Sequence, residues 1–530
     1  MDILLIQPPV HDFYLTQKRT IPYGLASIAA SLEAEGFKTQ IMDSLATRKS
    51  KPIPWPKDLS YLHAFYGRKD QSPFGLFHSF RHFGYSFQHI GKIARESGAF
   101  LIGISSLFTA YSNEALATAE IIKQWHPDCQ IVIGGHHPTY FPKEVLMHPA
   151  IDFVLRGEAE KSMPALAKAL KNNTPINTIP GIAYKKKDNS FLIHPPVILT
   201  DLDKLALPDY SKIQNKYYHR NDQKSLTVVG SRGCPMHCSY CALGDPLWIY
   251  RKKSVKRIIE EISSGAGNAD AIFIDFEDEN ISLDRSWFMA LMKQIHKNFR
   301  SKQVTLRAMN GLYPASLDSE MIDAMKQAGF NALNLSVGTL SQQQLKEFNR
   351  PDVSKQLPSI LRTAQKLNLS TTAYIIAGGL NQSPYVSVDD MIALFRMGTV
   401  IGLSIFYPAP GSQDYQTLAD KNMLPNSVNC MRGSAIPVSL STSRVQSITL
   451  LRLTRILNFI HFLRSEKHPI PKPSKCTQKK MPLGLDRMQT GTYLLSWFFY
   501  DAVIRGVDAD NTIYAHSVDT ALAQYLKQFV

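Results

Sequence analysis

The chain has 530 residues, of which 44% are hydrophobic and 19% charged, and a formal net charge of +15. This is the composition of an ordinary globular protein with room for two or three domains, and it excludes a disordered or fibrous chain. The amino terminus has no basic region before an apolar run, so it is not typical of a signal peptide. With six cysteines and no apolar stretch of about 18 residues, we expect a reduced, cytoplasmic protein without a disulfide framework.

Residues 1–170 alternate short apolar strands with helical segments. We expect helices at residues 24–35 and 113–124, the first of them ending at Gly36. The expected strands are 3–6, 39–42, 100–105, 131–133 and 151–155. The alternation predicts an α/β domain with a Rossmann-like, doubly wound parallel sheet, whose ligands lie at the carboxyl ends of the strands.

Two segments depart from this alternation. Residues 45–90 are rich in aromatic, basic and proline residues, and we expect them to pack over a cofactor or a neighbouring domain. No RNA-binding signature accompanies them, so nucleic acid is not an expected partner. Residues 171–222 are predicted to form a connector that contains a hairpin.

A second series of strands and helices occupies residues 223–415. The expected strands are 226–230, 271–280, 304–310, 332–338, 371–379 and 403–406. Six strand–helix units predict a partial parallel (β/α)6 barrel with its chemistry at the carboxyl ends of the strands. We expect Ser316 or Ser319 to cap one helix, and another to open at Ser387 with Asp390 in a capping box.

Three cysteines, Cys234, Cys238 and Cys241, lie in the run GSRGCPMHCSYCALG of residues 230–244. Three thiolates on one loop can hold three irons of a 4Fe–4S cluster and leave the fourth iron open to a substrate. Zinc, with His237 or a distant residue as a further ligand, is the alternative, although structural zinc sites usually have two separated pairs of ligands. The other three cysteines form no second pair.

With Tyr240 before its last cysteine, this loop resembles that of radical S-adenosylmethionine (SAM) enzymes. The first domain resembles the cobalamin-binding domain of one class of these enzymes, in segments 22–43, 101–111, 131–139 and 151–160. The resemblance covers roughly residues 1–415. It implies a 4Fe–4S cluster, SAM and cobalamin as cofactors, and an electron donor of the flavodoxin or ferredoxin type.

The resemblance also implies roles for residues of the first domain. Ser105 and Leu107 would line the pocket for the nucleotide tail of cobalamin, and Gly134 and Gly135 would let the backbone approach the cofactor. The usual motif that supplies the lower cobalt ligand is absent after the first strand, where His11 is a candidate. A Rossmann-like domain that has lost its cofactor is the alternative.

In the barrel, the resemblance places SAM against four strands. Glu277 and Asp278 would bind its amino group, Arg307 its carboxylate and Ser336 its ribose, and Gly378, with Gly379, would lie against the adenine. Alternatives remain open here: a helix N-cap or solvated strand end for the two acids, an ion pair for Arg307 and a simple turn for the glycines.

From these parts we expect a radical SAM enzyme that cleaves SAM to a 5′-deoxyadenosyl radical. The resemblance favours a cobalamin-dependent methyltransferase acting on an unactivated carbon of a small molecule. A radical SAM cyclase or rearrangement enzyme is the second candidate, and a non-catalytic cobalamin or iron–sulfur sensor the third.

Residues 416–530 are expected to be mainly helical. Residues 425–530 contain 13 Lys and Arg against six Asp and Glu, and thus carry +7 of the net charge. The apolar run at residues 448–463 has no clean polar face, which favours packing against the barrel over lying on a membrane. The basic, aromatic tail would also suit an apolar, lipid or anionic substrate at a membrane surface, as a peripheral contact.

Overall fold

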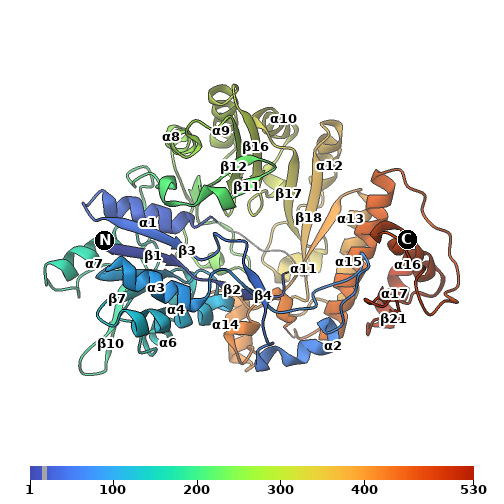
Figure 1. Cartoon of the computed structure of the whole chain (residues 1–530). Helices are drawn as coiled ribbons and strands as arrows, with labels where there is room; N and C mark the ends of the chain where they lie inside the picture. Colours follow the sequence, from blue (N-terminus) through green and yellow to red (C-terminus); the bar gives the residue numbers. More distant parts are fainter. Residues whose placement is uncertain (15–20, 438) are drawn as a thin grey trace.

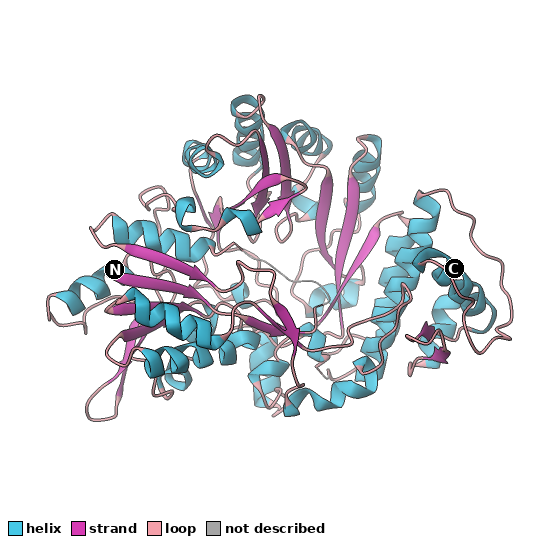
Figure 2. Cartoon of the chain, viewed as in Figure 1, coloured by secondary structure: helices cyan, strands magenta, loops and turns pink. Residues whose placement is uncertain are grey.

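The computed structural model describes residues 1–14, 21–437 and 439–530. Three regions follow one another along the chain: an amino-terminal sheet, a curved set of parallel strands, and a carboxyl-terminal helical region (Figure 1). Helices cover the outer faces of the strands in the first two regions (Figure 2). The predicted fold class, a doubly wound sheet followed by a partial barrel and a mainly helical end, is confirmed.

The amino-terminal sheet has seven strands in the order β10-β9-β8-β7-β6-β1-β3, and the five from β8 to β3 are parallel. Alternate residues of β1 point to opposite faces, so that Ile3 and Leu5 pack under one layer of helices and Leu4 and Ile6 under the other. The strands are β1 (Ile3–Gln7), β3 (Thr39–Asp43), β6 (Leu101–Ser105), β7 (Gln130–Gly134), β8 (Phe153–Leu155), β9 (Ile182–Lys185) and β10 (Phe191–Ile193).

Two layers of helices cover this sheet. The first contains α1 (Tyr23–Glu33) and α7 (Ser162–Lys171), and the second contains α3 (Phe87–Ser97), α4 (Ser112–Trp125) and α6 (Pro142–Leu146). The short helix α5 (His136–Tyr140) follows the carboxyl end of β7. The hairpin expected within the connector forms β9 and β10, so the sheet of the first domain extends past residue 170 to Ile193.

The segment of residues 45–90 packs on the carboxyl-terminal region. Its strands β4 (Ser50–Pro52) and β5 (Arg81–Phe83) form a small antiparallel sheet with β2 (Val10–Asp12), and it also contains the short helix α2 (His63–Tyr66). Phe13, Tyr66 and Phe80 share one buried cluster with Ile436 and Ile448. Figure 1 shows α2 beside the start of the long helix α15 (Arg444–Ser465). The expected packing on a neighbouring domain is thus present.

The barrel consists of six parallel strands in two groups of three. They are β12 (Gln223–Val228), β15 (Ala271–Phe276) and β16 (Gln303–Ala308), then β17 (Ala332–Gly338), β18 (Ser370–Ala377) and β19 (Val400–Ile405). Only isolated bridges, Leu306 with Phe330 and Leu312 with Leu335, join the two groups within the described residues. Their helices are α8 (Val255–Ala266), α9 (Arg285–Asn298), α10 (Ser319–Ala328), α11 (Gln342–Glu347), α12 (Leu357–Lys366), α13 (Pro384–Arg396) and α14 (Gln413–Asp420).

Two helix starts differ from those expected. Asp318, and neither Ser316 nor Ser319, caps α10 by accepting a bond from the Met321 amide at 2.8 Å. Helix α13 begins at Pro384 with Ser383 as its cap, and not at Ser387. Pro384 suits the first helical position because its missing N–H would have no partner there.

The carboxyl-terminal region contains α15, α16 (Arg487–Asp501), α17 (Thr520–Lys527) and the hairpin of β20 (Arg505–Val507) and β21 (Ile513–Ala515). As expected for the run at 448–463, α15 packs against the barrel, where it contacts α13 and β19. The Asn458 side chain bonds both the amide and the carbonyl of Ile401 on β19, at 2.9 and 2.8 Å. No helix in the described part of the chain has both the length and the apolar character that crossing a bilayer requires.

Candidate functional site

The three cysteines lie on the loop that follows β12, at the carboxyl end of the first barrel strand. A two-stranded hairpin, β13 (Ser231–Arg232) with β14 (Arg251–Lys252), closes the base of this loop. Cys238 is buried, and Cys234 and Cys241 are half-buried. Burial raises the pKa of Cys241 to about 11, and the neighbouring Cys238 and Cys234 add to the rise, so the three sulfurs are close enough to influence one another.

Asp278, predicted to bind the SAM amino group, is instead fully buried under the start of the cysteine loop. Its carboxylate accepts bonds from the Gly230 amide at 3.1 Å and from the Ser231 hydroxyl at 2.6 Å. Burial raises the pKa of Asp278 to about 6. Asp278 therefore holds the loop in place.

Arg307 lies on β16 and Glu277 directly follows β15, and each of them bonds a polar side chain of the neighbouring strand or of the turn after it. Arg307 donates from Nε to Asp275 Oδ1 at 2.9 Å, which is the ion pair that the sequence left open. Glu277 accepts a bond from Asn310 Nδ2 at 2.6 Å. Burial and the nearby Asp275 raise the pKa of Glu277.

Glu279, which the sequence did not single out, is half-buried beside the cysteine loop. Its Oε2 and the Oδ1 of Asn280 are buried and have no hydrogen-bond partner among the described residues. Burial raises the pKa of Glu279 to about 7, and Asp278 contributes to the rise. A buried carboxylate oxygen without a partner is rare in proteins and marks a place where a positively charged or hydrogen-bonding ligand fits.

Arg350, at the end of the segment after α11, connects the cysteine loop with β17. Its Nη1 lies 3.7 Å from Cys238 Sγ and 3.0 Å from the Tyr240 hydroxyl. Its Nη2 donates to Ser336 Oγ at 3.1 Å. Gly338 makes room for it, because a Cβ there would come within 2.9 Å of the arginine Cδ. Ser336 is thus placed beside the cysteine loop, as the predicted ribose contact would require.

Gly378 and Gly379 follow β18 and meet different neighbours. Gly378 has φ +76°, and a Cβ added to it would be 3.7 Å from Ser447 of α15. A Cβ at Gly379 would collide with the Phe348 ring at 2.6 Å. The first glycine therefore serves a turn toward the carboxyl-terminal region, and the second allows close packing with the α11 segment.

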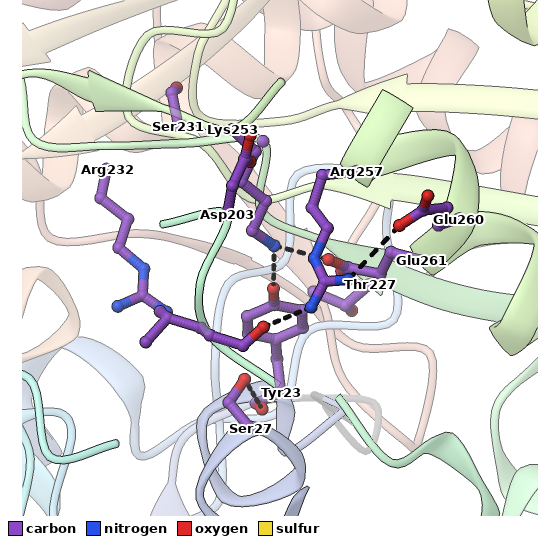
Figure 3. Close-up of polar contacts among 12 residues, drawn as sticks. Tyr23, Ser27, Asp203, Thr227, Ser231, Arg232, Lys253, Arg257, Glu260 and Glu261 are labelled. Carbon is purple, nitrogen blue, oxygen red and sulfur yellow. Dashed lines mark hydrogen bonds and ion pairs between the residues drawn. The ribbon is translucent and has the colours of Figure 1, made fainter. Parts of the chain in front are cut away.

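Ion pairs join the cysteine loop to the first domain. On the hairpin at its base, Arg232 pairs with Glu160, and Arg251 Nη1 lies 2.8 Å from Glu158 Oε2. Next to the hairpin, Lys253 pairs with Glu261 of α8 and donates to the hydroxyl of Tyr23, on α1, at 2.8 Å (Figure 3). Lys253 and Glu261 are buried, at 5% and 0% exposure. The loop is thus fixed between the two domains.

The predicted cobalamin residues lie together at the carboxyl edge of the first sheet. Ser105 of β6 is paired in register with Gly134 of β7. Gly135 has φ +119°, and a Cβ there would come within 2.6 Å of the Ser106 carbonyl oxygen. Leu107 and Phe108 are 52% and 54% exposed at this edge. At this edge, the backbone at Gly135 passes close to that at Ser106. The exposed side chains of Leu107 and Phe108, which follow Ser106, give the edge an apolar surface.

His11 does not fit a cobalt ligand in this structure. Its Nε2 lies 2.8 Å from His82 Nδ1, and its Nδ1 lies 2.9 Å from Glu114 Oε1. Both ring nitrogens therefore already have partners, and the expectation for His11 is not supported.

Comparison with known protein families gives two matches, one in each of these domains. Residues 80–167 match the B12 binding domain, and residues 228–392 match the radical SAM superfamily. The chain is a radical SAM protein with a B12-binding domain. The two matched segments contain the exposed edge of the first sheet and the cysteine loop of the barrel.

Individual relatives agree with this assignment. The cytidylyl-2-hydroxyethylphosphonate methyltransferase of Streptomyces wedmorensis is 24% identical over 71% of this chain and 72% of its own length. The anaerobic magnesium-protoporphyrin IX monomethyl ester cyclase of Rubrivivax gelatinosus is 25% identical over 58% and 56%. The radical SAM methyltransferase TsrM of Kitasatospora setae, solved with cobalamin and a 4Fe–4S cluster, has a TM-score of 0.59 and 16% identity, covering 79% of this chain and 75% of TsrM. The structural likeness shows the shared fold of this radical SAM protein.

The residues of this radical SAM protein fit the groups that its family uses. Within the described residues, no three Cys, His, Asp or Glu side chains surround a position for a single metal ion. Cys234, Cys238 and Cys241 on one loop are the three thiolates that a 4Fe–4S cluster would use. The unpartnered oxygens of Glu279 and Asn280 suit a ligand beside that cluster. The exposed Leu107 and Phe108 suit a large apolar ring system.

Sequence reasoning missed Glu279 and Arg350. A signal for Glu279 was present, because it follows the two acids that were chosen and belongs to the same strand end. Arg350 had no comparable signal, since it lies 112 positions after Cys238 in the chain and only the barrel brings them together.

Proposed function

We propose that this chain is a cobalamin-dependent radical SAM methyltransferase that acts on an unactivated carbon of a small molecule. The observation that carries the proposal is the ionic fixing of the cysteine loop between a B12-binding sheet and a radical SAM barrel. These ion pairs hold the cysteine loop of the barrel against the B12-binding domain. Relatives named as methyltransferases support the transfer of a methyl group.

Cys234, Cys238 and Cys241 would hold the cluster, and the edge formed by Ser105, Leu107, Gly134 and Gly135 would hold cobalamin. When bound, the cluster with SAM supplies a carbon-centred radical, and cobalamin supplies a carrier for a methyl group. The protein's own contribution is to bind, orient and shield these groups.

Within the barrel, we assign different side chains to the amino group, the carboxylate, the ribose and the adenine of SAM. Glu279 offers a buried carboxylate oxygen without a partner to the amino group of SAM. Arg350, next to Cys238, is a second candidate besides Arg307 for its carboxylate, and both guanidinium groups also have protein partners, which are Tyr240 and Ser336 for Arg350 and Asp275 for Arg307. Ser336 and Gly378 remain the proposed contacts for the ribose and adenine, and Glu277 a second acid for the amino group.

The proposal is tested by reconstituting the protein anaerobically with iron, sulfide and hydroxocobalamin, reducing it, adding SAM and quantifying the nucleosides. We expect S-adenosylhomocysteine and 5′-deoxyadenosine, with both lost in Cys238→Ala and the first lost without cobalamin. The half-buried Cys476, changed to Ala, is the matched control, because it lies outside the cysteine loop. Neither nucleoside from a protein with a full cluster would count against the proposal.

A cyclase or rearrangement enzyme is the second candidate, favoured by the likeness to the magnesium-protoporphyrin IX monomethyl ester cyclase. In that case, 5′-deoxyadenosine would form without S-adenosylhomocysteine. The substrate class is a further part of the proposal. The exposed Phe462, Leu483 and Tyr493 of the basic carboxyl-terminal region would suit an apolar or lipid substrate taken from a membrane surface.

A further inference from the structure

The segment between helices α15 and α16 carries a concentrated positive charge. Residues 467–485, called the basic segment below, contain five lysines and no Asp or Glu. All five lysines are exposed, and the ion pairs of the described residues include none of them. They are Lys467, Lys472, Lys475, Lys479 and Lys480. The charge of the basic segment is therefore available to a partner outside the protein.

The backbone of the basic segment is held in place at several points. Ser496 of α16 donates from Oγ to the Lys472 carbonyl at 2.5 Å, and its own carbonyl accepts a bond from the Ser474 amide at 3.2 Å. Farther along, the amide of Ile513, on β21, donates to the Lys479 carbonyl at 2.9 Å. Figure 2 shows the segment as a loop along the outer edge of the carboxyl-terminal region. The lysines thus extend outward from a backbone that is bonded to the fold.

Exposed apolar and aromatic side chains accompany these lysines. Leu483 is 86% exposed, more than any other large apolar side chain among the described residues, and Ile470 is exposed as well. On α16, Tyr493 and Tyr500 are exposed and lie three residues before and four after Ser496. Residues at this spacing share one face of a helix, so both tyrosines lie on the face to which the basic segment is bonded.

This combination matches the chemistry of an anionic bilayer surface. Lysine clusters are attracted to acidic headgroups, while exposed leucine and tyrosine side chains gain by entering the interface below them. A single strand of nucleic acid would instead stack its bases on aromatic side chains placed among the basic ones. The basic segment itself contains no Phe, Tyr or Trp. The apolar content at Leu483 and Ile470 therefore favours lipid.

We propose that the basic segment docks this protein on a bilayer that contains anionic phospholipid. The lysines lie among the headgroups, and Leu483, Tyr493 and Tyr500 lie at the level of the interface. The inference rests on the proposed function in one respect, because it names the surface from which that site would take an apolar substrate. Docking itself needs neither SAM nor turnover.

The test measures binding of the reconstituted full chain to vesicles by sedimentation. The vesicles consist of phosphatidylcholine alone, or of phosphatidylcholine with roughly one quarter phosphatidylglycerol. The variants of the basic segment are Lys475→Gln/Lys479→Gln and Leu483→Ser. The matched control is Lys186→Gln/Lys187→Gln, which removes two exposed lysines from the turn between β9 and β10 of the first domain.

We expect the wild type to bind the vesicles with phosphatidylglycerol and not those of phosphatidylcholine alone. Because each lysine near an anionic surface strengthens binding about fivefold, the double lysine variant should bind about 10- to 30-fold more weakly. Leu483→Ser should lose about tenfold, since a buried leucine is removed from the interface. The control should bind like the wild type.

Three results would overturn the proposal. One is the absence of wild-type binding to the anionic vesicles, and another is an equal loss in the control, which would show attraction by net charge alone. The third is tighter binding to a single-stranded DNA oligonucleotide than to vesicles, with no effect of Leu483→Ser, which would assign the segment to nucleic acid. SAM cleavage by the wild type without vesicles tests the proposed function separately.

Discussion

At the scale of single residues, burial decides which charged groups can serve a ligand. Arg307 and Asp278 already have protein partners, one in an ion pair and the other under the cysteine loop. Arg350, beside that loop, is bonded as well, to Tyr240 and Ser336, whereas Glu279 keeps a buried oxygen without a partner. The spacing of acidic and basic residues along a strand indicates which residues lie near a site. It does not indicate which of them already have hydrogen-bond or ion-pair partners within the protein.

Replacing Arg350 by Gln should weaken SAM binding without removing iron. Hydrogen bonds to charged groups contribute about 1.5–3 kcal/mol, so we expect the dissociation constant of SAM to rise about 10- to 150-fold. SAM titration monitored by the cluster's spectrum measures this constant, and iron analysis gives the cluster content. Arg285→Gln, which alters exposed ion pairs with Asp318 and Glu320, is the control. Unchanged SAM affinity would contradict the assignment.

At the scale of elements, Asp390 fixes helix α13 to the segment after β17. Its carboxylate accepts bonds from Thr339 Oγ1 at 2.6 Å and from the Leu340 amide at 3.0 Å. The sequence assigned Asp390 to a capping box, whereas the helix begins three residues before Ser387 and Asp390 bonds across to another element. Burial raises the pKa of Asp390 to about 6, from 3.8.

Stability should therefore respond to pH through Asp390. Because its pKa is higher in the folded chain than in the unfolded chain, its contribution is fully present below pH about 4 and is lost as the pH rises to about 6. One pKa unit corresponds to about 1.4 kcal/mol, so Asp390→Asn should gain about 2–3 kcal/mol relative to the wild type between pH 4 and pH 7. Urea unfolding at both pH values measures this difference, and the exposed neighbour Asp389→Asn should show no such gain.

The hairpin β13–β14 depends on buried charges. Arg251 and Glu158 have side chains that are only 6% and 11% exposed, so removing one charge leaves the other without compensation. We expect Glu158→Gln to lower the free energy of unfolding by about 3–5 kcal/mol and to reduce the iron bound per chain. Thermal unfolding and iron analysis are the measurements.

The control for the hairpin is Asp201→Asn, which removes a pair with Lys204 whose side chains are 47% and 79% exposed. Exposed pairs contribute about 0–1 kcal/mol, so this variant should behave like the wild type. Equal effects of the two substitutions would show that the buried pairs do not hold the loop.

At the scale of the whole molecule, the exposed edge of the first sheet should bind cobalamin through apolar contact. Burying a large apolar side chain contributes about 1.5–3 kcal/mol, so Phe108→Ser should weaken cobalamin binding by about tenfold or more. Cobalamin retained after gel filtration, read by its absorbance, measures this loss. Met147→Ser, which alters a side chain 70% exposed on the same domain, should retain cobalamin. Equal retention by all three proteins would contradict this role for the edge.

The carboxyl-terminal region depends on long-range packing for its place. Helix α15 lies against β19 and also against the aromatic segment of residues 45–90. Arg452 on α15 is 3% exposed and bonds the Phe74 carbonyl at 3.1 Å, 378 residues away in sequence. The first and last parts of the chain are thus joined outside the barrel.

The sequence by itself determined the two α/β domains, their strands and the cysteine loop. Apolar periodicity and cysteine spacing involve residues that are close together in the chain, so both can be recognised from the sequence alone. The tertiary structure alone decided the caps of α10 and α13, the partners of Asp278, Arg307 and His11, and the places of Glu279 and Arg350. These depend on burial and on contacts between residues far apart in sequence, because a charged group is free or occupied only once the chain has brought its partners to it.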